Sequence, residues 1–414
     1  EEPAGSNFTL KFYPTGVARA ITSTTAPAGG FIRLNAADRV TIDGSIGGTG
    51  TDRSLTITDT NTGASSAAIW LQSNGADGAT NNTIKNVNII GTSVTATAGT
   101  LFGIGSGSAT VSVTSFGTGN VNNTFQNNDI RKTQIGIYSG GASAANKNTG
   151  TVISQNVMNA ASPNNLTTGG ILVNFDNGAS ITRNDIGNII KHDGTVGTTG
   201  TAFGIALGVV PSNTVTAFGG SDVTNATVTR NKIDNLTQLN STGFSAFGIV
   251  VNSVTSGTTL VANNMLSQIR AASTSSDFSG GIIAGGGTGS TTQIYANTVS
   301  MSGARGAASF PSYGLAIGSG NPTVDVRDNI FYNTQTTSST GKMYAIANGS
   351  STFTNMTSSH NDLVTTVGAS FFVGQTGGLG TTCGRRAPSS GRRRARGRRG
   401  PSCGRPCSCA GRRA

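Results

Sequence analysis

The chain has 414 residues, of which 60 are Gly, 35% are hydrophobic and only 11% are charged. Intrinsic disorder is excluded, because disordered segments are rich in charge and lack the regularly spaced Ile, Val and Phe of this chain, and no apolar run approaches the roughly 18 residues that a membrane span needs. The formal net charge of +11 does not predict a nucleic-acid partner for the whole chain, because the 11 Arg of residues 383–414 produce it and the rest has 17 basic and 17 acidic residues.

The N-terminal part of the chain shows no secretion signal. It begins Glu1-Glu2-Pro3, which we interpret as a processed or truncated start. Residues 1–29 are predicted to form an N-terminal strand and cap segment, in which Phe8 to Ile21 cover one end of the next domain. That domain, residues 30–375, begins with two segments, 40–44 and 84–89, that look like degenerate turns of the repeat described next.

A first repeated motif reads aromatic-Gly-Ile, and its simpler copies retain only Gly-Ile or a close variant of it. Its apolar third residues are 31 to 34 residues apart, with one interval of 44; they are Ile104, Ile137, Ile171, Ile205, Ile249, Ile282, Leu315 and Ile346. A recurrence of this length is the signature of a solenoid, in which each repeat supplies one turn.

A second motif, apolar-x-x-Asn-x-apolar, alternates one for one with the first. Its central residues are Asn128, Asn156, Asn184, Asn231, Asn264, Asn297, Asn329 and Asn361, and fifteen of the sixteen flanking positions are apolar, the exception being Ser358. Asn suits a sharp corner because it tolerates left-handed backbone geometry, and its amide both donates and accepts hydrogen bonds. We therefore expect the stacked Asn side chains to bond to one another along the solenoid.

The segments between the corners are predicted to be strands, because they are short, β-branched and bounded by Gly, Ser and Asn. One strand per motif, stacked on the same strand of the next turn, gives parallel sheets with strands about 4.8 Å apart. The predicted fold is all-β, a right-handed parallel β-helix of eight to ten turns, which we expect to be a monomer. Residues 1–382 contain no Cys, so this domain does not depend on disulfides.

With its inward Ile and Val and its repeated Asn, the chain resembles the right-handed parallel β-helix family, the pectin-lyase-like superfamily. It is especially similar to the Gly-, Thr- and Asn-rich repeat proteins that bacteria secrete or display. The resemblance implies an extracellular or cell-surface protein. Enzymes of the superfamily act on acidic polysaccharides through carboxylates or calcium-binding Asp clusters, but this chain departs from that pattern. Its only Glu are Glu1 and Glu2, and no two of its 15 Asp are adjacent. We predict no metal and no cofactor.

The catalytic candidates are correspondingly few. One enzyme hypothesis pairs Asp129 with Asp185, which lie beside Asn corners two turns apart; that is roughly 10 Å, slightly beyond the range of inverting glycosidases. The other interpretation is a stack of opposite charges on consecutive turns, such as Asp185 and Lys232. His192 and His360 are predicted to be solvated loop residues.

The ligand-binding candidates follow from the Gly-Ile strands. If each Ile points inward, the next residue points outward, and in several turns that residue is apolar. Such a face is either covered by the long loops of the same chain or offered to a partner or flat ligand. The candidate ligand-binding residues are Tyr138, Leu172, Val250 and Ile283.

Residues 376–414 are predicted to be a non-globular tail. From residue 383 the tail uses only Cys, Gly, Arg, Ala, Pro and Ser, as expected when a GC-rich gene is read out of frame, and we interpret 383–414 as such an artefact. A genuine Arg-rich arm would instead bind nucleic acid or another polyanion. The spacing of Cys403, Cys407 and Cys409 does not fit a zinc site.

Two functions follow from these observations. The leading hypothesis is a non-catalytic structural, adhesive or surface-display β-helix protein outside the cell, with a polysaccharide or another cell-surface component as its partner. The alternative is a polysaccharide-binding or polysaccharide-active β-helix of the lyase or hydrolase type.

Overall fold

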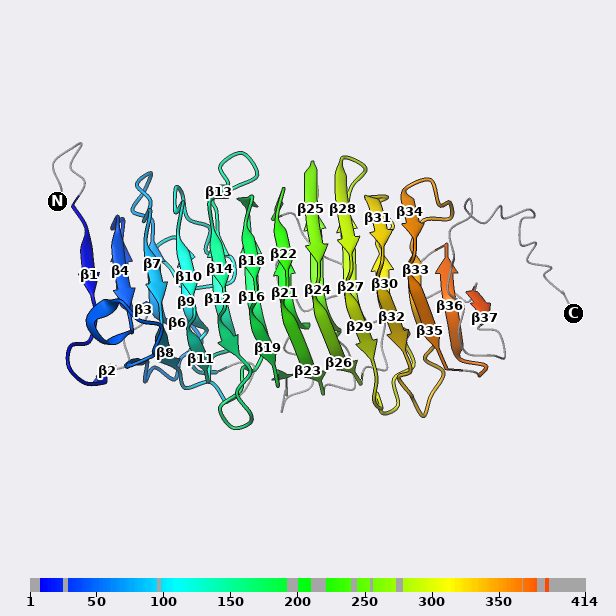
Figure 1. Ribbon diagram of the computed structural model, residues 1–414, viewed down its shortest axis with the longest axis horizontal. Coiled ribbons are helices and arrows are strands. Elements are labelled where there is room, and N and C mark those ends of the chain that lie inside the picture. The colour runs from blue at the N-terminus through cyan, green and yellow to red at the C-terminus, as the bar shows by residue number, and fades with distance from the viewer. Residues whose placement is uncertain are drawn as a thin grey trace, which may run out of the picture.

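The computed structural model describes residues 8–24, 29–94, 98–191, 200–209, 221–239, 244–253, 256–272, 278–366, 368–377 and 384–386. These residues wind into a right-handed parallel β-helix, whose strands lie side by side along the long axis of the molecule (Figure 1). Three parallel sheets run the length of the solenoid, and each turn contributes one strand to each sheet. The predicted fold class is therefore confirmed.

Sheet A carries the apolar residue that precedes each Asn corner. Its strands are β1 (Leu10–Phe12), β4 (Val40–Asp43), β7 (Thr83–Lys85), β10 (Thr124–Gln126), β14 (Val152–Ser154), β18 (Ser180–Thr182), β22 (Thr227–Thr229), β25 (Gly257–Ala262), β28 (Ser290–Tyr295), β31 (Thr323–Arg327) and β34 (Met356–Ser359). A short 3-10 helix, Ile46–Gly48, follows β4.

Sheet B follows the Asn corner. Its strands are β2 (Arg19–Thr22), β5 (Leu55–Thr58), β8 (Val87–Ile90), β11 (Asp129–Arg131), β15 (Val157–Met158), β19 (Asp185–Gly187), β23 (Lys232–Gln238), β26 (Met265–Ala271), β29 (Thr298–Met301), β32 (Ile330–Asn333) and β35 (Asp362–Thr365), with β20 (Ile190–Lys191) also paired to β23.

Sheet C contains the Gly-Ile motifs. Its strands are β3 (Gly29–Asn35), β6 (Ser66–Gln72), β9 (Phe102–Gly107), β12 (Ile135–Gly140), β16 (Gly169–Asn174), β21 (Ala202–Leu207), β24 (Ala246–Ser253), β27 (Ser279–Gly286), β30 (Ser312–Ile317), β33 (Met343–Asn348) and β36 (Phe371–Thr376), after which β37 (Gly384–Arg386) pairs antiparallel with β36. A separate pair, β13 (Asn148–Thr149) and β17 (Asp176–Asn177), lies outside the three sheets.

The described residues form eleven turns, one more than the upper end of the predicted range. The additional turn comes from the segment that we expected to act as a cap. Its residues supply β1 and β2, which pair in parallel with β4 and β5. The two segments predicted as degenerate turns are β4 and the β7–β8 region.

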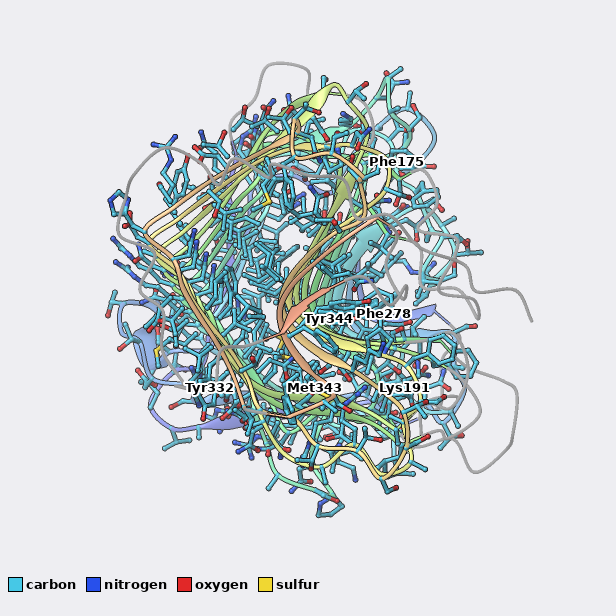
Figure 2. All side chains as sticks on the ribbon, turned by 90° about the vertical axis from the view of Figure 1, so that its right-hand side faces the viewer. Phe175, Lys191, Phe278, Tyr332, Met343 and Tyr344 are labelled. Atoms are coloured by element: carbon cyan, nitrogen blue, oxygen red, sulfur yellow. The ribbon has the colours of Figure 1, made fainter. Side chains whose placement is uncertain are left out.

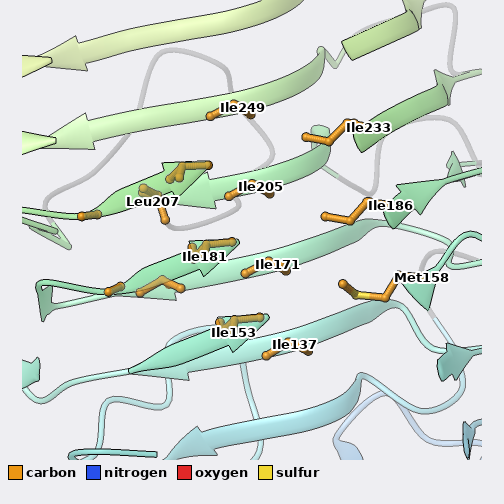
Figure 3. Close-up of a cluster of buried hydrophobic side chains, with 14 of the residues drawn as sticks. Ile137, Ile153, Met158, Ile171, Ile181, Ile186, Ile205, Leu207, Ile233 and Ile249 are labelled. Atoms are coloured by element: carbon orange, nitrogen blue, oxygen red, sulfur yellow. The ribbon is translucent and has the colours of Figure 1, made fainter. Parts of the chain in front are cut away.

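The lumen is filled by stacked apolar side chains, three rows of which appear in Figure 3. Ile153 stacks on Ile181 in sheet A, Met158 on Ile186 in sheet B, and Ile137 on Ile171 in sheet C. All of these side chains are buried. Because burial of an apolar side chain contributes about 1.5–3 kcal/mol, these rows supply the main force that holds each turn against the next.

The predicted ladder of Asn side chains runs without interruption through eight turns. The Nδ2 of Asn184 donates to Oδ1 of Asn231 at 2.9 Å, and Nδ2 of Asn231 donates to Oδ1 of Asn264 at 3.0 Å. From Asn156 onward, each Oδ1 also accepts the backbone N–H of the Asn in the preceding turn, as Asn231 Oδ1 does from Asn184 at 3.0 Å. The buried polar atoms of the corner are thereby satisfied.

The reason we gave for Asn at the corner needs correction. The left-handed residue is the one before each ladder Asn: φ is 56° at Arg183, 59° at Arg230, 53° at Ala296 and 59° at Asp328. Because Gln155, Arg183, Arg230 and Ala296, which have no preference for this conformation, adopt it at half of the eight corners, the corner does not depend on a residue that prefers it. The ladder Asn is needed for its amide.

The Gly of the aromatic-Gly-Ile motif also has a steric role. Sheet C bends there, so that two consecutive residues face the lumen and the aromatic residue before them faces outward, as in Tyr344-Ala345-Ile346. A Cβ at Gly248 would lie 2.5 Å from Cδ2 of Leu266 and 2.6 Å from the carbonyl oxygen of Gly281. Since real Cβ contacts are never this close, only a very small residue fits between sheets B and C.

Candidate functional site

The four residues predicted to bind a ligand lie in one row on the outer face of sheet C. This is the placement expected if the Ile before each of them points into the lumen. Tyr138 pairs with Leu172, and Val250 pairs with Ile283. None of the four is more than 3% exposed. An exposed apolar stripe is therefore the wrong interpretation, and the other expectation, a face covered by the same chain, describes the geometry.

The cover is a second hydrophobic cluster outside the lumen. Loop residues Leu101, Val111 and Val209 belong to it, and Val113 and Phe278 pack against it. The aromatic residues of the Gly-Ile motifs join the same cluster and stack along the axis: Tyr313 and Tyr344 have ring centroids 5.5 Å apart. Phe278 and Tyr344 lie on the same side of sheet C in Figure 2. This face stabilises the fold and is closed to a ligand.

The two catalytic candidates are not brought together. Asp129 is held by Arg131 of its own strand, with a bidentate contact of 2.9 and 2.6 Å. Strand β15 separates Asp129 from Asp185. Asp185 instead lies beside Lys232 of the next turn, 3.4 Å away, so the stack of opposite charges that we predicted is present.

A different carboxylate accompanies Asp185. Nδ2 of Asn159 donates to Oδ1 of Asp185 at 2.9 Å and to Oδ1 of Asp234 at 3.2 Å, which places the two carboxylates within about 6 Å of each other. Lys232 contacts both, at 3.4 and 3.3 Å. These groups come from three consecutive turns on the outer face of sheet B.

Gly187 makes this arrangement sterically possible. Asn159 and Asp234 lie two turns apart, and Gly187 is the residue of the intervening turn that lies between them. A Cβ at Gly187 would be 2.1 Å from Oδ1 of Asp234 and 2.6 Å from Oδ1 of Asn159. The missing side chain leaves room for these two oxygens, so the side chains of Asn159 and Asp234 meet over Gly187.

The cluster continues sideways through two more amides to a guanidinium. Asn188 donates to Oδ1 of Asn159 at 2.6 Å, Asn235 donates to Oδ1 of Asn188 at 2.7 Å, and Arg270 donates to Oδ1 of Asn235 at 3.0 Å. We call this set the sheet B polar cluster: Asn159, Asp185, Asn188, Lys232, Asp234, Asn235 and Arg270. It has two carboxylates and two cations, so its net charge is zero.

The cluster is accessible. The side chains of Lys232, Asp185 and Asp234 are 52%, 41% and 31% exposed. Beyond it on the same face, towards the C-terminal end, lie three exposed apolar side chains, Met265, Ile330 and Tyr332. Tyr332 lies on the outside of the coil in Figure 2. The outer face of sheet B thus carries a fixed polar cluster and three apolar side chains, here called the apolar platform, among which Thr298 and Ser300 also face outward.

The chemistry of the cluster favours binding over bond cleavage. Hydrolysis of a glycosidic bond needs two carboxylates with the scissile bond between them, but the amide of Asn159 and the ammonium of Lys232 occupy the space between Asp185 and Asp234. Among the described residues, no group of three or more His, Cys, Asp or Glu is placed to hold a metal ion.

The remaining predicted positions take no part in this cluster. His360 is exposed and occupies the left-handed position before Asn361. His192 and all four Cys, with most of the Arg-rich tail, lie outside the described residues. In the described part of the chain, no helix is long and apolar enough to span a membrane.

Among the buried carboxyl groups outside this cluster, those of Asp43 and Asp176 have clearly shifted pKa values. Burial opposes ionisation of Asp43, but hydrogen bonds from Asn86 and Ser45 outweigh it and lower the pKa of Asp43 to about 2. Burial raises the pKa of Asp176 to about 7, although Thr151 donates a hydrogen bond to it. Lys85 lies 3.1 Å from the Asp43 carboxylate, which identifies that group as a structural ion pair.

No family model matches this sequence, and no curated protein is similar to it. Among solved structures, the chain is similar to the A-module of mannuronan C-5 epimerase AlgE6 from Azotobacter vinelandii, with 12% identity, a TM-score of 0.34 and 92% of each chain covered. It is also similar to the catalytic domain of a GH87 α-1,3-glucanase, with 13% identity, a TM-score of 0.38, and 85% of this chain and 64% of that chain covered. At these identities the function has to be inferred from the residues of this chain itself.

Proposed function

We propose that this protein binds a polysaccharide outside the cell, without cleaving it, through the outer face of sheet B. The observation that carries the proposal is the bridge that Asn159 forms to Asp185 and Asp234 across Gly187. Sugar hydroxyls both donate and accept hydrogen bonds, and this cluster offers both kinds of partner: carboxylate oxygens that accept, and amide, ammonium and guanidinium groups that donate.

Preorganisation supports binding at this cluster. Its side chains are already held by hydrogen bonds to one another and lie on strands, so little conformational entropy would be lost when a ligand binds. Each carboxylate has about four lone-pair sites, and its contacts with Asn159 and Lys232 occupy only some of them. The carboxylates therefore remain able to accept bonds from hydroxyls.

The geometry of the solenoid supports a polymer as the ligand. Successive strands present their side chains at intervals of about 4.8 Å, so a chain of sugars that lies along the axis meets a regular series of polar positions. From Asp185 in β19 to Tyr332 in β32 there are four such intervals, or roughly 19 Å. That length accommodates several sugar units between the polar cluster and the apolar platform.

The zero net charge of the cluster favours a neutral polysaccharide over a strongly acidic one. Affinity electrophoresis and calorimetry with neutral glucans and mannans, and with pectin and alginate, test this. A D185N/D234N variant should lose at least about tenfold in affinity, because two charged acceptors are removed. The control is D325N/R327Q, which removes an exposed ion pair on the outer face of sheet A and should bind within twofold of the parent.

Three results would contradict the proposal. One is binding of no polysaccharide, and another is equal loss in the cluster variant and the control. The third is release of reducing or unsaturated ends on incubation, which would show that the chain cleaves its ligand.

A further inference from the structure

Two guanidinium groups border the sheet B polar cluster at the corner between sheets A and B. Arg183 and Arg230 each precede a ladder Asn, in the two consecutive turns that also carry Asp185 and Lys232. Both Arg residues are exposed. Within the part of the chain that the structure describes, neither side chain takes part in a hydrogen bond, an ion pair or a ring contact. Two cations are therefore free beside the proposed binding surface.

The backbone holds these two residues side by side. Strands β18 and β22, which end just before them, pair in parallel and in register. The ladder residues that follow them, Asn184 and Asn231, bond to each other at 2.9 Å. The φ angles of Arg183 and Arg230 are 56° and 59°. Because both residues have the same left-handed conformation at the same corner, their side chains leave the backbone in the same direction, about 4.8 Å apart.

The acid nearest in sequence to this pair is already engaged. Asp185 follows Arg183 by two residues, but Lys232 contacts its carboxylate at 3.4 Å and Asn159 donates to it at 2.9 Å. The same two turns thus place opposite charges together in sheet B and two like charges together at the corner. Like charges in adjacent strands repel each other. An anion bound between the two guanidinium groups would replace this repulsion with attraction to both of them.

The donors at this corner suit an oxyanion. A guanidinium carries five N–H donors in a planar fork that matches carboxylate and phosphate geometry bidentately, and a sulfate group has the same tetrahedral shape as phosphate. Gln155 extends the row by one turn towards the N-terminus. Its Oε1 accepts a hydrogen bond from Gln126 at 2.9 Å, so its amide presents Nε2 as a further donor. The corner therefore offers donors from three consecutive turns.

We propose that Arg183 and Arg230 bind an acidic substituent, a carboxylate or a sulfate ester, on an otherwise neutral polysaccharide. This inference rests on the polysaccharide binding proposed above and specifies the class of ligand: neutral sugars with widely spaced acidic groups. A polymer with an acid on every sugar would also bring negative charge over Asp185 and Asp234, and like charges at an interface weaken binding. The neutral cluster and the cationic corner together select a sparsely charged chain.

Calorimetry with dextran and with its lightly carboxymethylated and lightly sulfated derivatives tests the selection. The parent protein should prefer one or both derivatives over neutral dextran. In R183Q/R230Q this preference should fall by at least about tenfold, because two charge-assisted contacts are removed. The matched control is R19Q/R33Q, which removes two exposed Arg of the first turn and changes the net charge equally. Its preference should stay within about twofold of the parent.

NMR of the arginine Nε–H groups separates this site from binding of the polymer. The signals of Arg183 and Arg230, assigned by their loss in R183Q and R230Q, should shift together on titration with methyl glucuronide or methyl glucoside sulfate, and not with methyl glucoside. The acid that shifts them identifies the substituent.

Two results would overturn the anion site even if the protein binds neutral dextran. One is a pair of signals that neither acid shifts, and the other is an equal loss of preference in R19Q/R33Q. Signals that shift in a protein that binds no polymer would support the anion site and refute the proposed function of sheet B.

Discussion

Removal of one rung from the middle of the Asn ladder gives the sharpest prediction about the fold. In N231A, the backbone N–H of Asn184 loses its 3.0 Å acceptor and the carbonyl of Ile181 loses its 2.9 Å donor. The neighbouring rungs keep part of their bonding, since Nδ2 of Asn184 still donates to the carbonyl of Ile153 at 3.0 Å. Two buried groups are left unsatisfied, each at about 1–3 kcal/mol, so the free energy of unfolding should fall by about 2–6 kcal/mol.

Urea denaturation followed by circular dichroism measures this change as a shift of the midpoint at an unchanged slope. The matched control is T229A in the neighbouring strand β22, where a half-buried side chain on the outer face of sheet A is shortened. The free energy of unfolding of this variant should stay within about 0.5 kcal/mol of the parent. If N231A loses less than about 1 kcal/mol, or no more than T229A, the ladder does not stabilise the corner as argued.

Three further predictions concern the lumen and the corners. G248A should destabilise the fold by about 1–3 kcal/mol or more in thermal melting, because its Cβ would meet Leu266 and the carbonyl of Gly281; an unchanged melting temperature would contradict the steric role of this Gly. A296G should raise the free energy of unfolding by up to about 1 kcal/mol, because Gly adopts the left-handed conformation of this position without the strain of Ala, and this gain outweighs the entropy that Gly adds to the unfolded chain. A lower free energy of unfolding would show that the corner is not strained. Burial raises the pKa of Asp176 to about 7, so protonation of Asp176 stabilises the fold fully below pH 4, and this contribution, on the order of 4 kcal/mol, is lost as the pH rises to 7. In D176N the denaturation midpoint should not decline over this pH range. An equal decline in D176N would refute the assignment.

The fold could be predicted from the sequence because the apolar positions of the two repeated motifs are the ones that are buried. Each Ile of the Gly-Ile motif and each apolar neighbour of a ladder Asn occupies a stacked inward row, and the eight Asn bond in the expected order. The additional turn was missed because the segment of β1 and β2 carries neither motif. The outward direction of the aromatic residues was missed because strict alternation fails at the Gly, where the strand bends.

The functional cluster was harder to predict because it depends on groups far apart in the chain. Asn159 and Asp234 are separated by 75 residues and meet only because turns of unequal length are aligned in space. The sequence signal that could have indicated the cluster is Gly187. It occupies the outward position at which the neighbouring turns of sheet B carry Arg131, Asn159 and Asp234. The pairing of Asp185 with Lys232 was accessible from the sequence because both residues follow ladder Asn in adjacent turns.

The central claim, that the outer face of sheet B is the binding surface, can be tested by hydrogen exchange with and without an oligosaccharide of a polymer that binds. Bound ligand should slow exchange in β19, β23 and β26, around Asp185, Lys232 and Met265, and leave β18, β22 and β25 of sheet A unchanged. G187A, which forces Asn159 and Asp234 apart without removing a polar group, should abolish that protection. Protection confined to sheet A, or protection that persists in G187A, would contradict the account.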